Sequence, residues 1–231
     1  MKTIATLAFL LSLLILPSHA SERPNVLMIV VDDMNDWVGC LGGHPLVKTP
    51  NIDRLAKRGT LFTNAHCAAP VCNASRVATL TGLRPSTTGI YDNSVKWQDH
   101  LSSTTSLPQH FKRNGYTVLG GGKVFHHMPG FNRLSDWDEY LPQQFDGHFQ
   151  QSLHGGKDVT TFQFPQGYPL NGIPQVKALT RPPRNAREFD WGELNKGVYE
   201  TGDGKLTEWA KTQLQIARKQ PFLLVAGIYR P

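Results

Sequence analysis

Beyond its first twenty residues, the 231-residue sequence has no apolar run long enough to cross a membrane, since a spanning helix needs roughly 20 apolar residues. Lysine and arginine form no clusters, although the formal net charge is +6. We interpret this charge either as an ordinary solvated surface or as an attraction for an anionic substrate. The sequence has no nucleic-acid-binding motif, internal repeat or linker, so we expect one domain and no nucleic-acid partner.

The one long apolar run, IATLAFLLSLLIL, lies at the N-terminus behind Lys2 and precedes PSHA, in which Ser18 and Ala20 suit a cleavage site. Residues 1–20 are therefore predicted to be a signal peptide, and the exported chain, periplasmic or secreted, would start at Ser21. The alternative is an N-terminal membrane anchor. We disfavour it and expect no stable anchor, because the run is too short to span a bilayer.

Cysteine is scarce, with only Cys40, Cys67 and Cys72. An odd number is unusual in an exported protein, so one thiol is expected to be free, to pair with another chain or to be chemically altered. A disulfide between Cys40 and Cys67 would leave Cys72 as the odd residue. His66 beside these cysteines could suggest zinc, but no second ligand pair follows at a suitable spacing.

Apolar segments predict the strands of a buried sheet. The run VLMIVV, Val26 to Val31, has the length and β-branched content of a strand buried on both faces. The segment PFLLVAGIYRP predicts another buried strand, and YTVLG a shorter one, followed by a glycine-rich loop. The glycine spacing does not match a phosphate-binding loop.

Helices are expected between these strands. Thr49 followed by Pro50 marks a helix start and Gly59 a stop, and SLPQHFKRNG predicts a helix that ends near Gly115. Another helix is indicated by apolar residues at helical spacing: Leu206, Trp209, Ala210, Leu214 and Ala217. The alternation predicts an α/β fold with a largely parallel central sheet sandwiched by helices. Residues 127–200 are expected to form long, ordered loops that shape a substrate pocket.

Polar residues follow the strands at the end where ligands of such sheets gather. Asp32 and Asp33 end the first strand, and Lys123 and His126 follow the glycine-rich one. The two aspartates can share a target only if the strand stops there, because adjacent strand residues point to opposite faces. Their carboxylates favour Ca²⁺ or Mg²⁺ over zinc; a solvated acidic turn is the alternative.

Cys72 precedes a helix predicted from Ala74 to Thr81 and closed by Gly82, which places the thiol near the positive end of the helix dipole. Arg76 lies one turn further on the same side, where it could hold an anion or orient the group at position 72. From these residues alone, Cys72 is either a thiolate nucleophile or a buried cysteine.

Three segments in this order, NVLMIVVDD, TPNIDRLAKRGTLFTNAHCAAPVCNASRVATLTGLRPSTTGIYDN and GKVFH, closely resemble the type I sulfatases, most of all their iduronate-2-sulfatase branch. The resemblance covers residues 23–126 and, more loosely, the last strand. CNASR fits the family signature of Cys, any residue, Pro or Ala, any residue, Arg, followed by Thr-Gly. In that family a maturation enzyme oxidises this cysteine, here Cys72, to formylglycine.

The resemblance implies a sulfuric ester hydrolase of alkaline phosphatase-like fold that acts on a sulfated carbohydrate. One hydroxyl of the aldehyde hydrate would attack sulfur, and the other would expel sulfate by restoring the carbonyl. Asp32, Asp33 and the modified Cys72 would bind a divalent metal, usually Ca²⁺. The remaining catalytic roles would fall to Arg76 at the formylglycine hydroxyl and Lys123 at the sulfate. His126 would assist proton movement or bind the nucleophile side, with His127 a less favoured substitute.

The sequence departs from the family after residue 126. No Asp-His or Asp-Asn pair supplies further metal ligands, and Tyr229 stands where the family often has histidine. We therefore expect residues 21–231 to be the N-terminal portion of a sulfatase catalytic domain with its C-terminal part missing, and to be inactive as written.

Two other functions stay open on the sequence. One is a phosphonate or phosphodiester hydrolase of the same superfamily, and the other is a non-catalytic carbohydrate-binding protein on a sulfatase-like scaffold. Asn73-Ala74-Ser75 is formally a glycosylation sequon. A glycan there would block the pocket, so we expect it to be unused.

Overall fold

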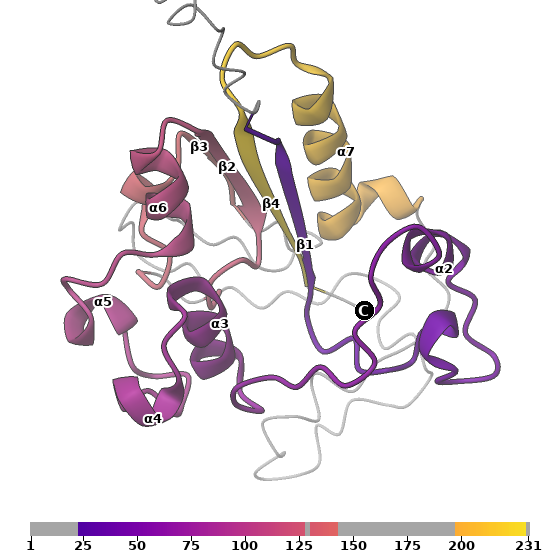
Figure 1. Ribbon diagram of the computed structural model, residues 1–231, viewed down its shortest axis with the longest axis horizontal. Coiled ribbons are helices and arrows are strands. Elements are labelled where there is room, and N and C mark those ends of the chain that lie inside the picture. Colours follow the sequence, from indigo (N-terminus) through magenta and orange to yellow (C-terminus); the bar gives the residue numbers. More distant parts are fainter. Residues whose placement is uncertain (1–22, 128–129, 143–196, 230–231) are drawn as a thin grey trace, which may run out of the picture.

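The computed structural model describes residues 23–127, 130–142 and 197–229 (Figure 1). Four strands form one sheet in the order β1-β4-β2-β3, and every neighbouring pair is parallel. The strands are β1 (Val26–Val31), β2 (Thr117–Gly122), β3 (Glu139–Leu141) and β4 (Phe222–Ile228). The expected parallel α/β sheet is confirmed.

Helices connect the strands, and several are short. The α-helices are α2 (Pro50–Ala56), α3 (Cys72–Thr81), α4 (Pro85–Thr88), α5 (Trp97–His100), α6 (Leu107–Arg113) and α7 (Gly202–Gln215). The 3-10 turns are η2 (Gly39–Leu41), η3 (Leu134–Asp136) and η5 (Val198–Glu200).

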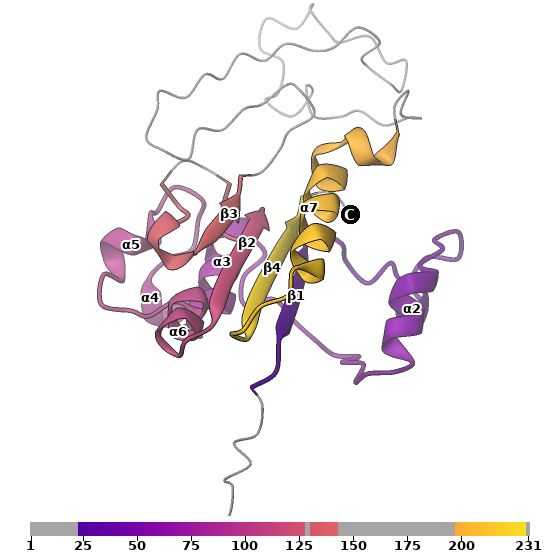
Figure 2. The ribbon, with the colours of Figure 1, turned by 90° about the horizontal axis from the view of Figure 1, so that it is seen from above.

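The centre of the sheet is covered on both faces. Side chains of β4 alternate: Val225 packs with Val77 of α3 in one apolar cluster, and Leu224 packs with Ala210 of α7 in another. Figure 2 shows α7 on one side of the sheet and α3 and α6 on the other. Leu224 and Val225 are fully buried, which explains the unbroken apolar run of this strand.

Strand β1 has the predicted bounds, but the prediction that it is buried on both faces is wrong for the described part of the chain. Leu27 is 46% exposed and Ile29 is 59% exposed, whereas Met28 packs against the core. β1 lies at the edge of the four-stranded sheet, next to β4, and α7 contacts β4 and β2. The face that bears Leu27 and Ile29 is therefore open to solvent.

Helix α2 begins as predicted, with Thr49 before it and Pro50 in its first turn, and ends at Ala56. Its apolar side chains do not face the sheet: Ile52 is 38% and Leu55 59% exposed. Figure 2 shows the helix standing apart from the sheet. A polar contact anchors it instead, because Asp53 Oδ1 accepts the backbone N–H of Cys40 at 2.8 Å.

The disulfide considered between Cys40 and Cys67 is not formed, and all three cysteines of the chain, each within the described ranges, are free thiols. Cys40 lies in η2, held by Asp53 of α2, and Cys67 is exposed in the loop before α3. The hypothesis that Cys40 pairs with Cys67 is therefore wrong.

Helix α7 buries Leu206 and Ala210 as the helical spacing predicted. Leu214, also placed on the inner face by the sequence, is 43% exposed, and the helix ends before Ala217. Gln213 is buried in its place, 6% exposed. Its side-chain amide donates to Glu139 Oε1 at 2.9 Å, and this polar contact joins the helix to β3.

Part of the segment expected to consist of loops is described and contains η3 and β3. Strand β3 pairs in parallel with β2 but is only three residues long, so it lacks the apolar run that marks the other strands. Residues 143–196 and the predicted signal peptide, residues 1–20, lie outside the described residues. Within the described ranges, no helix is long and apolar enough to span a membrane.

The glycine triplet lies in β2 and not in a loop, which corrects the sequence-based boundary. A Cβ on Gly120 would lie 2.5 Å from the Trp137 ring, and one on Gly122 would overlap the carbonyl oxygen of Gly227. Gly122 also has φ of 73°. These glycines therefore allow close packing around β2 and a sharp exit from the strand.

We predict that Gly122→Ala lowers the free energy of unfolding by about 3 kcal/mol, because the new methyl group meets backbone atoms of β4. Gly82→Ala is the matched control, since Gly82 also has φ of 73° but no atom within 4 Å of a Cβ. It should cost about 1 kcal/mol. Urea unfolding of both variants measures the difference; equal costs would contradict the packing explanation.

Candidate active site

The strand register brings together residues that are far apart in sequence. Val31 of β1 pairs with Ile228 of β4, and Gly122 of β2 pairs with Gly227. The residues that follow, Asp32, Tyr229 and Lys123, therefore meet at the carboxyl ends of three adjacent strands.

Asp32 is the centre of this group. Its side chain accepts from Arg76 at 2.6 Å through Oδ1 and forms an ion pair with Lys123 through Oδ2. All three residues are buried, at 8%, 7% and 3% exposure. Burial raises the pKa of Asp32, but the hydrogen bonds from Lys123 and Arg76 outweigh it and hold the pKa below its usual value. The carboxylate is charged at neutral pH.

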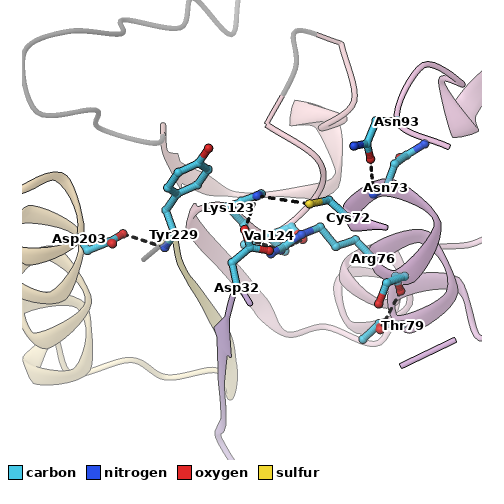
Figure 3. A network of polar contacts seen from close by, with 11 residues as sticks. Asp32, Cys72, Asn73, Arg76, Thr79, Asn93, Lys123, Val124, Asp203 and Tyr229 are labelled. Atoms are coloured by element: carbon cyan, nitrogen blue, oxygen red, sulfur yellow. Dashed lines mark hydrogen bonds and ion pairs between the residues drawn. The ribbon is translucent and has the colours of Figure 1, made fainter. Parts of the chain in front are cut away.

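Helix α3 begins at Cys72 itself, two residues before the predicted start, and ends at Thr81 as predicted. Gly82, which closes it, is in the left-handed conformation. The Lys123 ammonium lies 3.6 Å from Cys72 Sγ (Figure 3). Arg76, one turn further along, also donates to the carbonyl oxygens of Lys123 and Val124, the latter at 2.9 Å. Its guanidinium thus ties α3 to the chain after β2.

Asn73, the asparagine of the glycosylation sequon, is 1% exposed. Its side-chain amide donates to the carbonyl oxygens of Asp92 and Val95 at 2.9 and 2.8 Å. Its own backbone N–H donates to Asn93 Oδ1 at 2.9 Å (Figure 3). The amide nitrogen is buried and bonded in the folded protein, so Asn73 anchors the 92–95 loop against α3.

His126 and His127 follow Lys123 and stack edge to face, with ring centroids 4.5 Å apart. Burial, followed by the repulsion of neighbouring positive charge, lowers the pKa of each to about 4. His126 is 4% exposed, and its Nδ1 has no hydrogen-bond partner among the described residues. Both imidazoles are therefore neutral at pH 7.

Asp33, the second expected metal ligand, is exposed, and its φ of 50° ends the strand directly after Asp32, as predicted. The donor chemistry of the two aspartates fits Ca²⁺ or Mg²⁺. Two carboxylates are too few ligands for such an ion, because no group of three His, Cys, Asp or Glu side chains in the described ranges could hold a metal ion. Asp32 is instead neutralised by Arg76 and Lys123.

The structure thus gathers Asp32, Arg76, Lys123 and Cys72 into one contact network and leaves Asp33 outside it. Sequence reasoning overlooked the structural role of Asn73. It noted Tyr229 only as a departure from the family, and the position directly after a buried strand was the signal that could have marked it.

Comparison with known proteins identifies the family of the chain. A family model described as Sulfatase matches residues 24–231. The chain belongs to the sulfatase family. Iduronate 2-sulfatase from Homo sapiens is 48% identical over 227 residues, which are 93% of this chain and 36% of that protein. The resemblance to the iduronate-2-sulfatase branch is confirmed.

Solved structures show the sulfatase fold. The phosphonate monoester hydrolase of Agrobacterium radiobacter matches with a TM-score of 0.58 at 20% identity, over 90% of this chain and 41% of that one. A structure described as a complex with its substrate D-glucosamine-2-N,6-O-disulfate matches with a TM-score of 0.55 at 17% identity, over 89% and 34%. At these identities the likeness establishes the alkaline phosphatase-like fold alone.

This sulfatase chain spans only part of its relatives. It covers 36% of the human iduronate 2-sulfatase and 39% of a sulfatase from Formosa agariphila that is 37% identical over 218 residues. The match therefore establishes the family of this chain and not the activity of the whole protein.

The buried histidines predict acid sensitivity. Because the pKa of His126 is about 4 when folded and about 6.5 when unfolded, the unfolded state binds more protons between these values, and stability falls as pH falls. Between pH 7 and pH 5 this group should account for a loss of roughly 2 kcal/mol. Urea unfolding at both pH values measures this loss of unfolding free energy. In His126→Gln the loss between pH 7 and pH 5 should be smaller than in the wild type by roughly 2 kcal/mol.

The control is His100→Gln, since His100 is exposed. It should leave the pH dependence as in the wild type. A variant at His126 that loses as much stability as the wild type on acidification would contradict the assignment.

Proposed function

We propose that the protein is an exported sulfuric ester hydrolase, made with a signal peptide over residues 1–20, and that residues 21–231 form the N-terminal portion of its catalytic domain. The observation that supports this most is the position of Cys72 at the start of α3, within a sulfatase signature and 3.6 Å from the Lys123 ammonium. A cation at this distance suits an anionic reacting group.

In this proposal a maturation enzyme oxidises Cys72 to formylglycine, whose hydrate supplies a nucleophile that can later expel sulfate. Lys123 binds and neutralises the sulfate. Arg76, held by Asp32 and two carbonyl oxygens, fixes the N-terminal turn of α3 and orients the group at position 72. His126, neutral at pH 7, would assist proton movement or bind on the nucleophile side of the reacting group.

A divalent cation, Ca²⁺ or Mg²⁺, would be held by Asp32, Asp33 and the oxygen of modified residue 72, and would polarise the sulfate.

We propose a sulfated carbohydrate as the substrate class. Support comes from the sequence likeness to iduronate 2-sulfatase and from the fold shared with a protein solved with a disulfated glucosamine. The fold is equally shared with a phosphonate monoester hydrolase, so a phosphonate ester is the second candidate.

The test of this proposal starts with maturation of the protein expressed from its complete gene beside a formylglycine-generating enzyme. We expect the peptide that contains Cys72 to have the mass of the aldehyde, and a chromogenic sulfate ester to turn over faster than the matching phosphonate. Faster phosphonate hydrolysis would favour the second candidate. An intact thiol at Cys72 would favour the non-catalytic carbohydrate-binding alternative.

Cys72→Ser is the decisive variant for the mechanism. Its hydroxyl can accept a sulfate but cannot eliminate it, so we expect at most one turnover per molecule and a loss of steady-state activity of at least about 1,000-fold. A burst experiment at high enzyme concentration measures this. Sustained multiple turnover by the serine variant would refute the mechanism, and an unchanged melting temperature would show that the fold is intact.

A further inference from the structure

The Lys123 ammonium has an aromatic neighbour whose role the proposed reaction does not include. Its Nζ lies 4.4 Å from the centroid of the Tyr229 ring, on the ring face (Figure 3). At this distance the π-electrons attract the cation, and the attraction is strengthened where water is excluded. Lys123 is only 3% exposed, so the contact lies in such a place.

A backbone hydrogen bond and a ring contact hold Tyr229 in place. Its N–H donates to Asp203 Oδ1 at 2.9 Å, which ties the end of β4 to the first turn of α7. The ring also meets His127 edge to face, with centroids 5.8 Å apart. Gly227 lets the backbone of Lys123 approach β4 closely, since a Cβ there would overlap the carbonyl group of Lys123.

The lysine side chain is a flexible four-carbon chain with a compact charge, so the groups around the ammonium determine where Lys123 holds it. Its ammonium lies among Asp32, the sulfur of Cys72 and the Tyr229 ring. The carboxylate draws the charge toward β1, whereas the ring lies beyond the end of β4, between β1 and β2. Figure 3 shows the ammonium between the Tyr229 ring and the Cys72 sulfur, so the ring limits how far the ammonium can move away from Cys72.

We propose that Tyr229 is a positioning residue that holds the Lys123 ammonium against the group at position 72 through its ring face and not through its hydroxyl. An anionic group that arrives at residue 72 then meets a cation already in place. In this sense the inference rests on the proposed function and deepens it, but the placement itself is a property of the unmodified chain.

Alkylation of the unmodified Cys72 thiol tests this without any turnover. Iodoacetate and iodoacetamide react identically: the thiolate sulfur forms a bond to the methylene carbon, the C–I bond breaks and iodide leaves. Only iodoacetate is an anion. Both rate constants depend in the same way on the fraction of ionised thiol, so this fraction drops out of their ratio at one pH. The ratio therefore measures how strongly the cation beside the sulfur attracts an anionic reagent.

The rates are measured by mass spectrometry of the peptides from the full chain, and exposed Cys67 serves as the internal control. We expect Lys123→Met to lower the iodoacetate to iodoacetamide ratio at Cys72 about five-fold. Tyr229→Leu should lower it about three-fold, and Tyr229→Phe should leave it within a factor of two, because the ring face is retained. The ratio at Cys67 should not change.

A fluorinated series keeps the test valid if Tyr229→Leu fails to fold. Phenylalanines with one, two and three ring fluorines at position 229 retain the shape but weaken the ring face stepwise. We expect the logarithm of the ratio to fall in proportion. A merely structural role for the ring would leave the ratio constant along this series.

A constant ratio in the fluorinated series, or a ratio that Lys123→Met leaves unchanged, would overturn the proposal. Absence of sulfate ester turnover after maturation would count against the proposed function and not against this placement, because the alkylation measurement requires no catalysis.

Discussion

The site depends on one buried carboxylate that bridges two cations. Asp32 ends β1, Arg76 lies in α3 and Lys123 follows β2, so the ion pairs of Asp32 connect three elements that are distant in sequence. Buried charges are tolerated only when they are paired and hydrogen-bonded, and removing one partner leaves the others uncompensated. This requirement holds α3 over the end of the sheet, and it places Cys72 beside the Lys123 ammonium.

Much of this arrangement could be predicted from the sequence, because the signals were local. Unbroken apolar runs marked β1 and β4, and Gly82 marked the end of α3. Asp32 and Lys123, which directly follow two strands, lie together as expected, since the carboxyl ends of parallel strands gather at one edge. The signature around Cys72 indicated the family, which the match over residues 24–231 establishes.

The rest depended on contacts that no local pattern encodes. Strand order places β4 between β1 and β2, and only this order sets Tyr229 beside Lys123. The exposure of Ile29 follows from the edge position of β1, although its run suggests burial on both faces. Gly122 was predicted to lie in a loop. The reason for a glycine there is its close contact with the backbone of β4, which the sequence around Gly122 does not reveal.

A double-mutant cycle between Asp32 and Arg76 tests most directly whether this bridge organises the site. Unfolding free energies would be measured for Asp32→Asn, Arg76→Met and the double variant, in a buffer with a metal chelator. Asp32→Asn leaves both buried cations without their carboxylate, whereas Arg76→Met leaves Asp32 with Lys123 as its one remaining cation. The Asp32–Arg76 contact is lost in either single variant, so we predict that the double variant loses about 2 kcal/mol less than the sum of the two. Costs that add to within about 0.5 kcal/mol would show that the two residues act independently, and would contradict the account.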